Sequence, residues 1–162
     1  MTANKTLTAL IVLAVFTALL AAGIALPHGA AQPAIAQGTA QQYTMADIDN
    51  ALAGGPVFIE FETRECSYCK QQRPVSQALA DEYRGKVTFI FVDASRDRAL
   101  AKQFQVSGVP QMDVILDKSA GYTYVDKDGK ASDSIGASRF LGLTDKDTLK
   151  TALDAAVHMR GL

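Results

Sequence analysis

The pattern of hydrophobic and polar positions divides the chain into three parts. From Leu7 to Leu26 the residues are apolar except for two threonines and one glycine. Residues 27–42 are rich in Ala, Gln, Gly and Pro and contain no Lys, Arg, Asp or Glu, which is typical of a flexible tether. Over residues 43–162 short apolar runs alternate with helical patterns, which predicts a folded domain.

The first part has the length of a membrane span. As a helix rising about 1.5 Å per residue, Leu7 to Leu26 would cross a bilayer core of about 30 Å. A signal peptide, cleaved near Ala34-Ile35-Ala36, is one alternative, although this motif lies far beyond the apolar run. A buried core helix is another. We expect residues 1–26 to form an uncleaved signal-anchor helix.

The flanking charges predict the orientation of this helix. Lys5 and the amino terminus are the only positive charges beside it, so the N-terminus is expected in the cytoplasm and the rest of the chain outside. If the segment is cleaved instead, the domain is secreted or periplasmic. In both cases the folded domain is extracytoplasmic.

The periods within the folded part predict alternating helices and strands. Met45, Ile48 and Leu52 share one face of a short helix that ends at Gly54-Gly55. The further expected elements are a buried strand at Pro56–Phe61, a loop at Glu62–Glu65, a helix from Cys66 to about Arg84, a strand at Val87–Val92, a helix at Asp97–Phe104, a strand at Met112–Leu116, a hairpin of Tyr122–Val125 and Ser132–Ile135 around the turn Asp126–Gly129, and a last helix behind a capping box of Thr144 and Asp147. The order βαβ and then ββα predicts an α/β fold with a partly parallel sheet.

Length and charge narrow the classes of function. With 162 residues the chain has room for one ordinary domain besides its N-terminal part. The formal net charge is -1, Trp is absent, and no basic block occurs. We therefore expect no nucleic-acid partner, because such partners usually require a basic surface.

The two cysteines of the chain, Cys66 and Cys69, lie where a helix is predicted to begin. A helix N-terminus stabilises a thiolate and can lower a thiol pKa from about 8.5 to between roughly 3.5 and 7.5. Cys66, nearer the terminus, is therefore the expected nucleophile. Cys69 lies one turn further in and is expected to resolve the mixed disulfide that Cys66 forms.

Glu60 is an acidic residue within the apolar strand Pro56–Phe61. Burial would raise the pKa of its carboxyl, so Glu60 could accept the proton of Cys69 near neutral pH or return it. The alternative is a solvated acid on an edge strand.

A structural disulfide and a metal site are the alternatives for the cysteine pair. A disulfide across so short a loop constrains the unfolded chain little. Zinc or copper(I) would need further ligands, but His28 lies in the tether and His158 in the last helix. We expect neither a metal nor another bound cofactor.

Several motifs together resemble the thioredoxin family over roughly residues 43–162. They are Pro56–Phe61, Cys66–Lys70, Pro74, Ala80–Tyr83 and Val106–Pro110. The resemblance implies a thioredoxin fold, with a central mixed sheet of four or five strands flanked by helices and preceded here by the N-terminal hydrophobic helix. It also implies Cys66 as nucleophile, Cys69 as resolving cysteine and Glu60 as buried acid.

For substrate binding we expect Tyr68, between the two cysteines, and the resemblance implies Val109 and Pro110. It implies a cis Val109–Pro110 bond, whereas an ordinary turn proline is the alternative from the sequence alone. The bend would bring the Val109 backbone alongside Cys66, where an extended client segment could pair with it.

Several positions depart from the usual thioredoxin pattern. Glu65 stands where thioredoxins carry Trp, and Ser67-Tyr68 replaces Gly-Pro. Phe91 replaces a Lys that often accompanies the buried acid, and Gln111 follows the proline in place of Thr. The direction of redox exchange therefore stays open. Two longer regions, 112–136 and 139–143, have no predicted role.

We expect a thiol-disulfide oxidoreductase that acts on protein thiols and disulfides outside the cytoplasmic membrane. Cytosolic reductants do not reach that compartment directly, so a membrane electron-transfer partner or an oxidant must reset the cysteine pair. The alternatives are a redox-inactive binding or chaperone module of the same fold and a membrane-anchored metal carrier.

Overall fold

The computed structural model describes residues 42–162. The helices in this region are α2 (Met45–Leu52), α3 (Ser67–Glu82), α4 (Arg98–Gln103), α5 (Ile135–Ser138) and α6 (Lys146–Met159). The strands are β1 (Val57–Glu62), β2 (Thr88–Asp93), β3 (Gln111–Lys118), β4 (Tyr122–Val125), β5 (Ala131–Ser132) and β6 (Phe140–Leu141). The predicted signal-anchor helix, and the predicted tether up to residue 41, lie outside the described residues. Between residues 42 and 162 no helix is both long and apolar enough to cross a membrane.

The strands form one mixed sheet in the order β2-β1-β3-β4-β5, with β6 paired to β3. β1 and β2 are parallel, and the other pairs are antiparallel. The α/β class with a partly parallel sheet is confirmed. The expected number of four or five strands is too low, because this sheet has six. β5 and β6 have two residues each, too few to show a period in the sequence.

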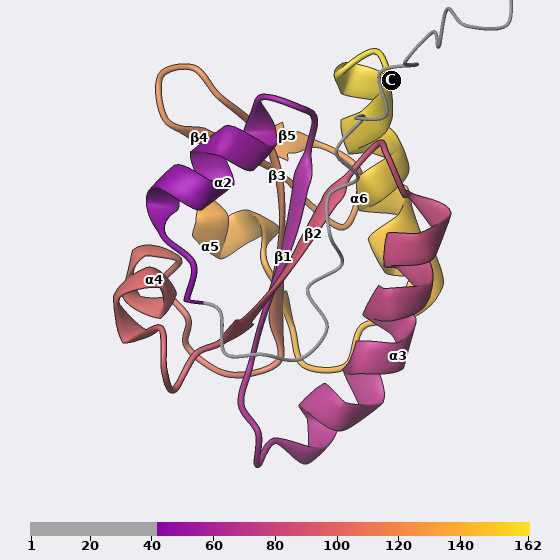
Figure 1. Ribbon diagram of the computed structural model, residues 1–162. Helices are drawn as coiled ribbons and strands as arrows, with labels where there is room; N and C mark the ends of the chain where they lie inside the picture. The colour runs from indigo at the N-terminus through magenta and orange to yellow at the C-terminus, as the bar shows by residue number, and fades with distance from the viewer. Residues whose placement is uncertain (1–41) are drawn as a thin grey trace, which may run out of the picture. The chain divides into compact units, whose positions relative to one another are not determined.

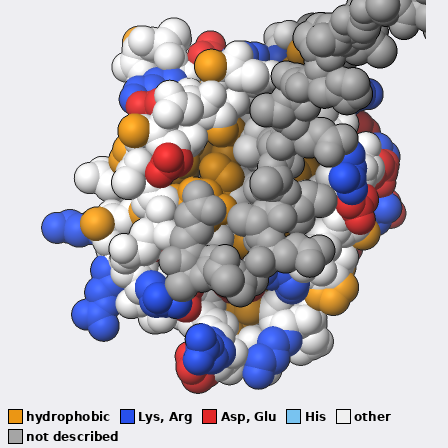
Figure 2. All heavy atoms as spheres, viewed as in Figure 1, with side chains coloured by type: hydrophobic (Ala, Val, Ile, Leu, Met, Phe, Trp, Pro, Cys, Tyr) orange, Lys and Arg blue, Asp and Glu red, His pale blue; other side chains and the backbone are white. Residues whose placement is uncertain are grey.

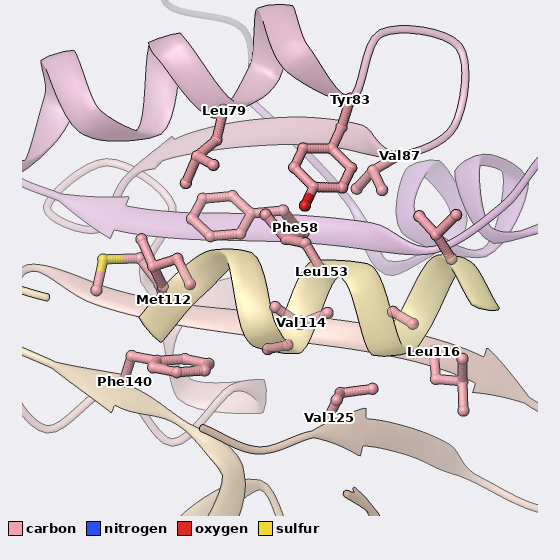
Figure 3. Packing of buried hydrophobic residues seen from close by; sticks show 14 residues of the cluster. Phe58, Leu79, Tyr83, Val87, Met112, Val114, Leu116, Val125, Phe140 and Leu153 are labelled. Carbon is pink, nitrogen blue, oxygen red and sulfur yellow. The ribbon is translucent and has the colours of Figure 1, made fainter. Parts of the chain in front are cut away.

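Helices cover both faces of the sheet: α3 and α6 lie on one side, and α2, α4 and α5 on the other (Figure 1). On the first side, Phe58 of β1 lies in a buried cluster with Leu79 of α3 and Leu153 of α6 (Figure 3). On the second side, Ile59 of β1 lies in a cluster with Ile48 of α2. Successive residues of β1 therefore point into different cores, which explains why this strand is apolar at nearly every position.

The predicted hairpin is confirmed at its turn but not in its second strand. Asp126 and Lys130 are joined by a backbone hydrogen bond of 2.9 Å, and Gly129 has a φ of 75°, a left-handed conformation that favours glycine. The predicted strand Ser132–Ile135 is wrong. β5 ends at Ser132, and Ile135 begins the short helix α5, where its side chain is buried in the second core.

The predicted start of the last helix is also wrong by one residue. The N-cap of α6 is Asp145, whose carboxylate accepts a hydrogen bond from the Thr148 N–H at 2.8 Å. The Thr144 N–H instead donates to the side-chain oxygen of Gln72 at 2.9 Å. A contact with α3 therefore replaces the local capping box expected of Thr144 and Asp147.

Charged side chains of both signs are mixed on the face shown in Figure 2, including the region over α3 and α6. Glu82 of α3 pairs with Lys146 and Lys150 of α6 at 2.9 and 3.0 Å. These pairs join the two helices at the surface, where each contributes little to stability.

Candidate active site

The end of β1 and the start of α3 place the cysteine pair at one end of the sheet (Figure 1). Cys66 is the N-cap of α3, and its Sγ accepts a hydrogen bond from the Cys69 N–H at 3.0 Å. The two cysteines form a disulfide, with their Cα atoms 5.2 Å apart. Cys66 is half-buried, whereas Cys69 is 1% exposed. A second protein can therefore reach Cys66 far more readily than Cys69.

The segment before β3 faces the outer cysteine. The Val109–Pro110 peptide bond is cis, as predicted, so the alternative of an ordinary trans turn is wrong. The carbonyl oxygen of Val109 lies 3.6 Å from Sγ of Cys66. Within the described residues neither the N–H nor the C=O of Val109 takes part in a backbone hydrogen bond. Both groups are therefore suited to pair with an extended segment of another chain.

Two exposed leucines lie in or just after the short strand that pairs with the residue following Pro110. Leu141 of β6 pairs with Gln111, the residue after Pro110, and the Gly142 N–H donates to the Pro110 carbonyl oxygen at 2.8 Å. Leu141 is 49% exposed and Leu143 is 51% exposed. The sequence analysis assigned no role to region 139–143, although leucines on both sides of a glycine, outside any helical period, were a signal there.

Tyr68, the third predicted substrate-contacting residue, lies between the two cysteines in the first turn of α3. Its side chain is 59% exposed, which is unusual for a large aromatic residue. The structure thus exposes three apolar side chains on the segments around the site: Tyr68 between the two cysteines, and Leu141 and Leu143 in and just after β6, which pairs with the residue that follows Pro110.

Glu60 lies in an internal strand, between β2 and β3, so the alternative of an edge-strand acid is wrong. Its side chain is fully buried, and neither carboxyl oxygen has a hydrogen-bond partner in the described part of the chain. Burial raises the pKa of Glu60, while the nearby Ser76 hydroxyl and the charge of Arg73 partly oppose the rise. Ser76 and Cys69 both lie on the buried face of α3. Glu60 therefore lies beneath the same helix face as the inner cysteine.

Arg73 of α3 was not singled out by the sequence. Its Nε donates to Oε2 of Glu62 at 3.0 Å, its Nη2 contacts Oε1 of the same carboxylate, and its guanidinium lies 4.0 Å from the ring centroid of Phe91. Phe91 is the neighbour of Glu60 on β2. An arginine thus lies over the strand position where thioredoxins often have a lysine.

A second buried acid, Asp113 on β3, was also missed. It is 1% exposed, and its Oδ2 accepts a hydrogen bond from Gln111 at 3.1 Å. Burial raises the pKa of Asp113 to about 7, with the Gln111 hydrogen bond and the charge of Arg139 opposing the rise. Asp113 pairs with Ile59 across the strands, so it lies on the other face of the sheet from Glu60. Its signal was the same as for Glu60, an acidic residue inside an apolar run.

Metal ligands do not gather anywhere in residues 42–162: no group of three or more His, Cys, Asp or Glu side chains is placed to hold an ion. His158 lies in α6, and His28 is outside the described residues.

Known proteins match this chain in sequence. The profile of the thioredoxin family matches residues 37–137, a region that contains Glu60, both cysteines and Pro110. A thioredoxin of Staphylococcus aureus is 27% identical over 111 residues, which cover 68% of this chain and 91% of that protein.

Solved structures of thioredoxins share the fold. A mutant thioredoxin from Halobacterium salinarum has a TM-score of 0.55 and 23% identity, covering 74% of this chain and 96% of its own. Chloroplastic thioredoxin z has a TM-score of 0.53 and 16% identity, covering 74% of this chain and 97% of its own.

Proposed function

This chain belongs to the thioredoxin family, and on that premise we propose that it exchanges disulfides with protein clients outside the cytoplasmic membrane. The observation that carries the proposal is the position of the cysteine pair. Cys66 caps α3 and is half-exposed beside the unpaired backbone of Val109, whereas Cys69 is buried behind it. Such an arrangement provides one sulfur for attack and one for resolution.

The exchange uses the two sulfurs in turn. In the reducing direction the Cys66 thiolate attacks one sulfur of a client disulfide, and the other client sulfur leaves as a thiolate that takes up a proton. The Cys69 thiolate then attacks Sγ of Cys66, so that the bond between Cys66 and the client breaks and the client's remaining sulfur leaves and is protonated. The client has gained two electrons and two protons, and the protein keeps the Cys66–Cys69 disulfide. Oxidation of a client runs the same steps in reverse.

Glu60 serves the second of these attacks. Cys69 must lose its proton before it attacks, and its burial keeps bulk water from accepting that proton readily. A carboxylate beneath the same helix face can accept the proton, directly or through a water molecule, and return it in the opposite direction. The raised pKa of Glu60 brings its proton affinity closer to that of a thiol.

Client recognition follows from the groups around Cys66. The N–H and C=O of Val109 would pair with an extended client backbone, beside the Pro110 ring, and this pairing tolerates many client sequences. Tyr68, Leu141 and Leu143 add exposed apolar surface for client side chains near the reacting cysteine. No bound cofactor takes part, because the cysteine pair carries the electrons.

The extracytoplasmic location rests on the apolar run from Leu7 to Leu26 and on Lys5 before it. A membrane tether keeps the domain near a membrane electron-transfer partner or an oxidant. Such a partner is needed because the compartment has no direct supply of cytosolic reductant.

The proposal is tested with the full chain in detergent micelles. The rate at which dithiothreitol reduces a protein disulfide is measured with wild type, with Cys66→Ser and without added protein. We expect acceleration by wild type alone. Equal rates for wild type and Cys66→Ser would favour a redox-inactive binding module, and metal bound by the purified reduced chain would favour a metal carrier.

A further inference from the structure

Glu60, the buried acid of β1, has no cation next to it on the neighbouring strand β2. In the parallel register Glu60 is paired with Phe91 of β2, and both side chains face α3. A buried carboxylate is strongly disfavoured, because burial removes its hydration, and the neutral Ser76 hydroxyl near Glu60 opposes this only in part. On the other side of β1, Glu60 is paired with Met112 of β3, so a cation that stabilises its ionised form has to come from a helix packed on this face of the sheet.

Arg73 is in a position to be that cation. It lies on α3 immediately before Pro74, and its guanidinium stacks on the ring of Phe91, the strand neighbour of Glu60. Burial lowers the pKa of Arg73, and the negative charge of Glu60 opposes this shift. Burial raises the pKa of Glu60, and the positive charge of Arg73 is among the influences that oppose the rise. A charge acts on a buried group over distances longer than a hydrogen bond, because the protein interior screens electrostatic interactions poorly.

Two further contacts hold the guanidinium in this place. Glu62 binds it through both carboxylate oxygens, and the side chains of this pair are 24% and 25% exposed. Glu62 follows Glu60 by two positions on β1, so the two side chains lie on the same face of the strand. The planar guanidinium of Arg73 can bind a carboxylate along one edge and stack its flat face on an aromatic ring. The ammonium group of a lysine cannot make both contacts.

We propose that Arg73, held by Glu62 and Phe91, is a positioning residue that sets the charge state of Glu60 for proton exchange with Cys69. This inference rests on the proposed function and adds a residue to it. Arg73 touches neither the client nor the sulfurs. It acts through Glu60, by keeping part of the buried carboxyl ionised and able to accept a proton.

Removing the charge of Arg73 and removing the charge of Glu62 should shift the titration of Glu60 in opposite directions. Removing the charge of Arg73 takes away the cation that favours the carboxylate, so the pH at which Glu60 titrates should rise. Removing the charge of Glu62 leaves the cation of Arg73 less neutralised and also removes a nearby negative charge, so the same pH should fall. A merely structural role of the pair would not produce shifts of opposite sign.

The titration of Glu60 can be followed without any activity measurement. The glutamates of the chain are Glu60, Glu62, Glu65 and Glu82. Carbon-13 labelling of their carboxyl groups in the full chain in micelles, with the cysteine pair oxidised, allows each titration to be followed by NMR, and Glu60→Gln assigns the signal.

We expect Arg73→Gln to raise the titration midpoint of Glu60 by about one pH unit or more, and Glu62→Gln to lower it. The midpoint in Arg73→Lys should lie between those of Arg73→Gln and wild type, because lysine keeps the positive charge but lacks the planar guanidinium. Arg84→Gln is the matched control, since Arg84 follows the same helix and pairs with Asp81 at the surface. The pH at which resolution by Cys69 is half-maximal should move in the same direction as the midpoint.

An unchanged or lowered Glu60 midpoint in folded Arg73→Gln would overturn the inference, even if wild type exchanges disulfides. If Arg73→Gln does not fold, Glu62→Gln decides, and an unchanged or raised midpoint in that variant is the contrary result. Failure of wild type to exchange disulfides would instead count against the proposed function, and the Glu60 titration would still report on Arg73.

Discussion

The Sγ atom of Cys66 lies 3.6 Å from the carbonyl oxygen of Val109, although 43 positions separate these residues along the chain. The sheet explains the contact. The end of β1 is antiparallel to the start of β3, where Phe61 pairs with Gln111. The loop that leaves β1 toward Cys66 therefore meets the segment that enters β3 through Val109 and Pro110. The candidate redox centre and the candidate client-binding backbone lie where these two segments meet.

The first prediction concerns the division of work between the cysteines. Cys69→Ser should accumulate mixed disulfides with client proteins, because Cys66 can still attack but nothing resolves the product. Cys66→Ser should accumulate none, because Cys69 is buried. Non-reducing gel electrophoresis of cells that express each full-length variant measures this, and the reverse pattern would show that the roles are exchanged.

The second prediction concerns Glu60→Gln. The variant should slow the resolution step by roughly ten-fold or more, because it lacks the group that accepts the Cys69 proton. The first attack by Cys66 should remain nearly as fast as in wild type, because Glu60 lies under the helix face of Cys69. Rapid-mixing kinetics with a disulfide client separates the two steps. An equal loss in both would indicate that Glu60 acts through the structure alone.

The third prediction concerns the pH dependence of stability and Asp113. The pKa of Asp113 is raised from 3.8 to about 7 in the folded protein, chiefly by burial. Below about pH 4 both the folded and the unfolded chain hold this proton, so the group costs nothing there. As the pH rises toward about 7 the unfolded chain releases the proton first, so the free energy of unfolding should decrease.

The measurement for Asp113 compares wild type with Asp113→Asn. Denaturant unfolding between about pH 4 and pH 8 should show a loss in wild type on the order of a few kcal/mol that is smaller in the variant. Asn keeps an oxygen that can accept the hydrogen bond from Gln111. Burial also raises the pKa of Glu60, but Glu60 is present in both proteins, so its contribution is the same in each pH profile. Parallel pH profiles of the two proteins would be the contrary result.

The fourth prediction concerns the exposed leucines beside Pro110. Leu141→Ser should raise KM for protein clients several-fold and leave the reaction with a small disulfide such as oxidised glutathione unchanged, because only a protein reaches this surface. Met159→Ser is the matched control, since Met159 is 43% exposed but ends α6. Steady-state kinetics with both substrates tests this. A similar effect of both variants would show that Leu141 has no specific role in client binding.

The fifth prediction concerns location. The full chain should sediment with membranes and stay there in high salt, because a helix from Leu7 to Leu26 would be buried in lipid. After reduction, a thiol reagent that cannot cross the membrane should label Cys66 in intact cells or in cells with a permeable outer layer. Recovery of the chain in the soluble fraction, starting after Ala36, would indicate cleavage instead.

Much of the fold and the central pair of the site are determined by local sequence. The apolar strand before Cys66, the two cysteines at a helix start and Pro110 before a buried strand each depend on residues close together in the chain. These features are visible in the periodicity of apolar residues and in the spacing of motif residues over short stretches. They can therefore be predicted without knowing how distant segments pack. The buried state of Glu60 follows in the same way from the apolar residues on both sides of it.

The tertiary structure alone decided which distant groups act on these residues. Arg73 reaches the strand pair of Glu60 and Phe91 only through the packing of α3 on the sheet, and Leu141 reaches Pro110 only through the pairing of β6 with β3. Two-residue strands such as β6 have no period of their own. They exist because a neighbouring strand offers backbone hydrogen-bonding groups at the right register, and that register is a property of the whole sheet.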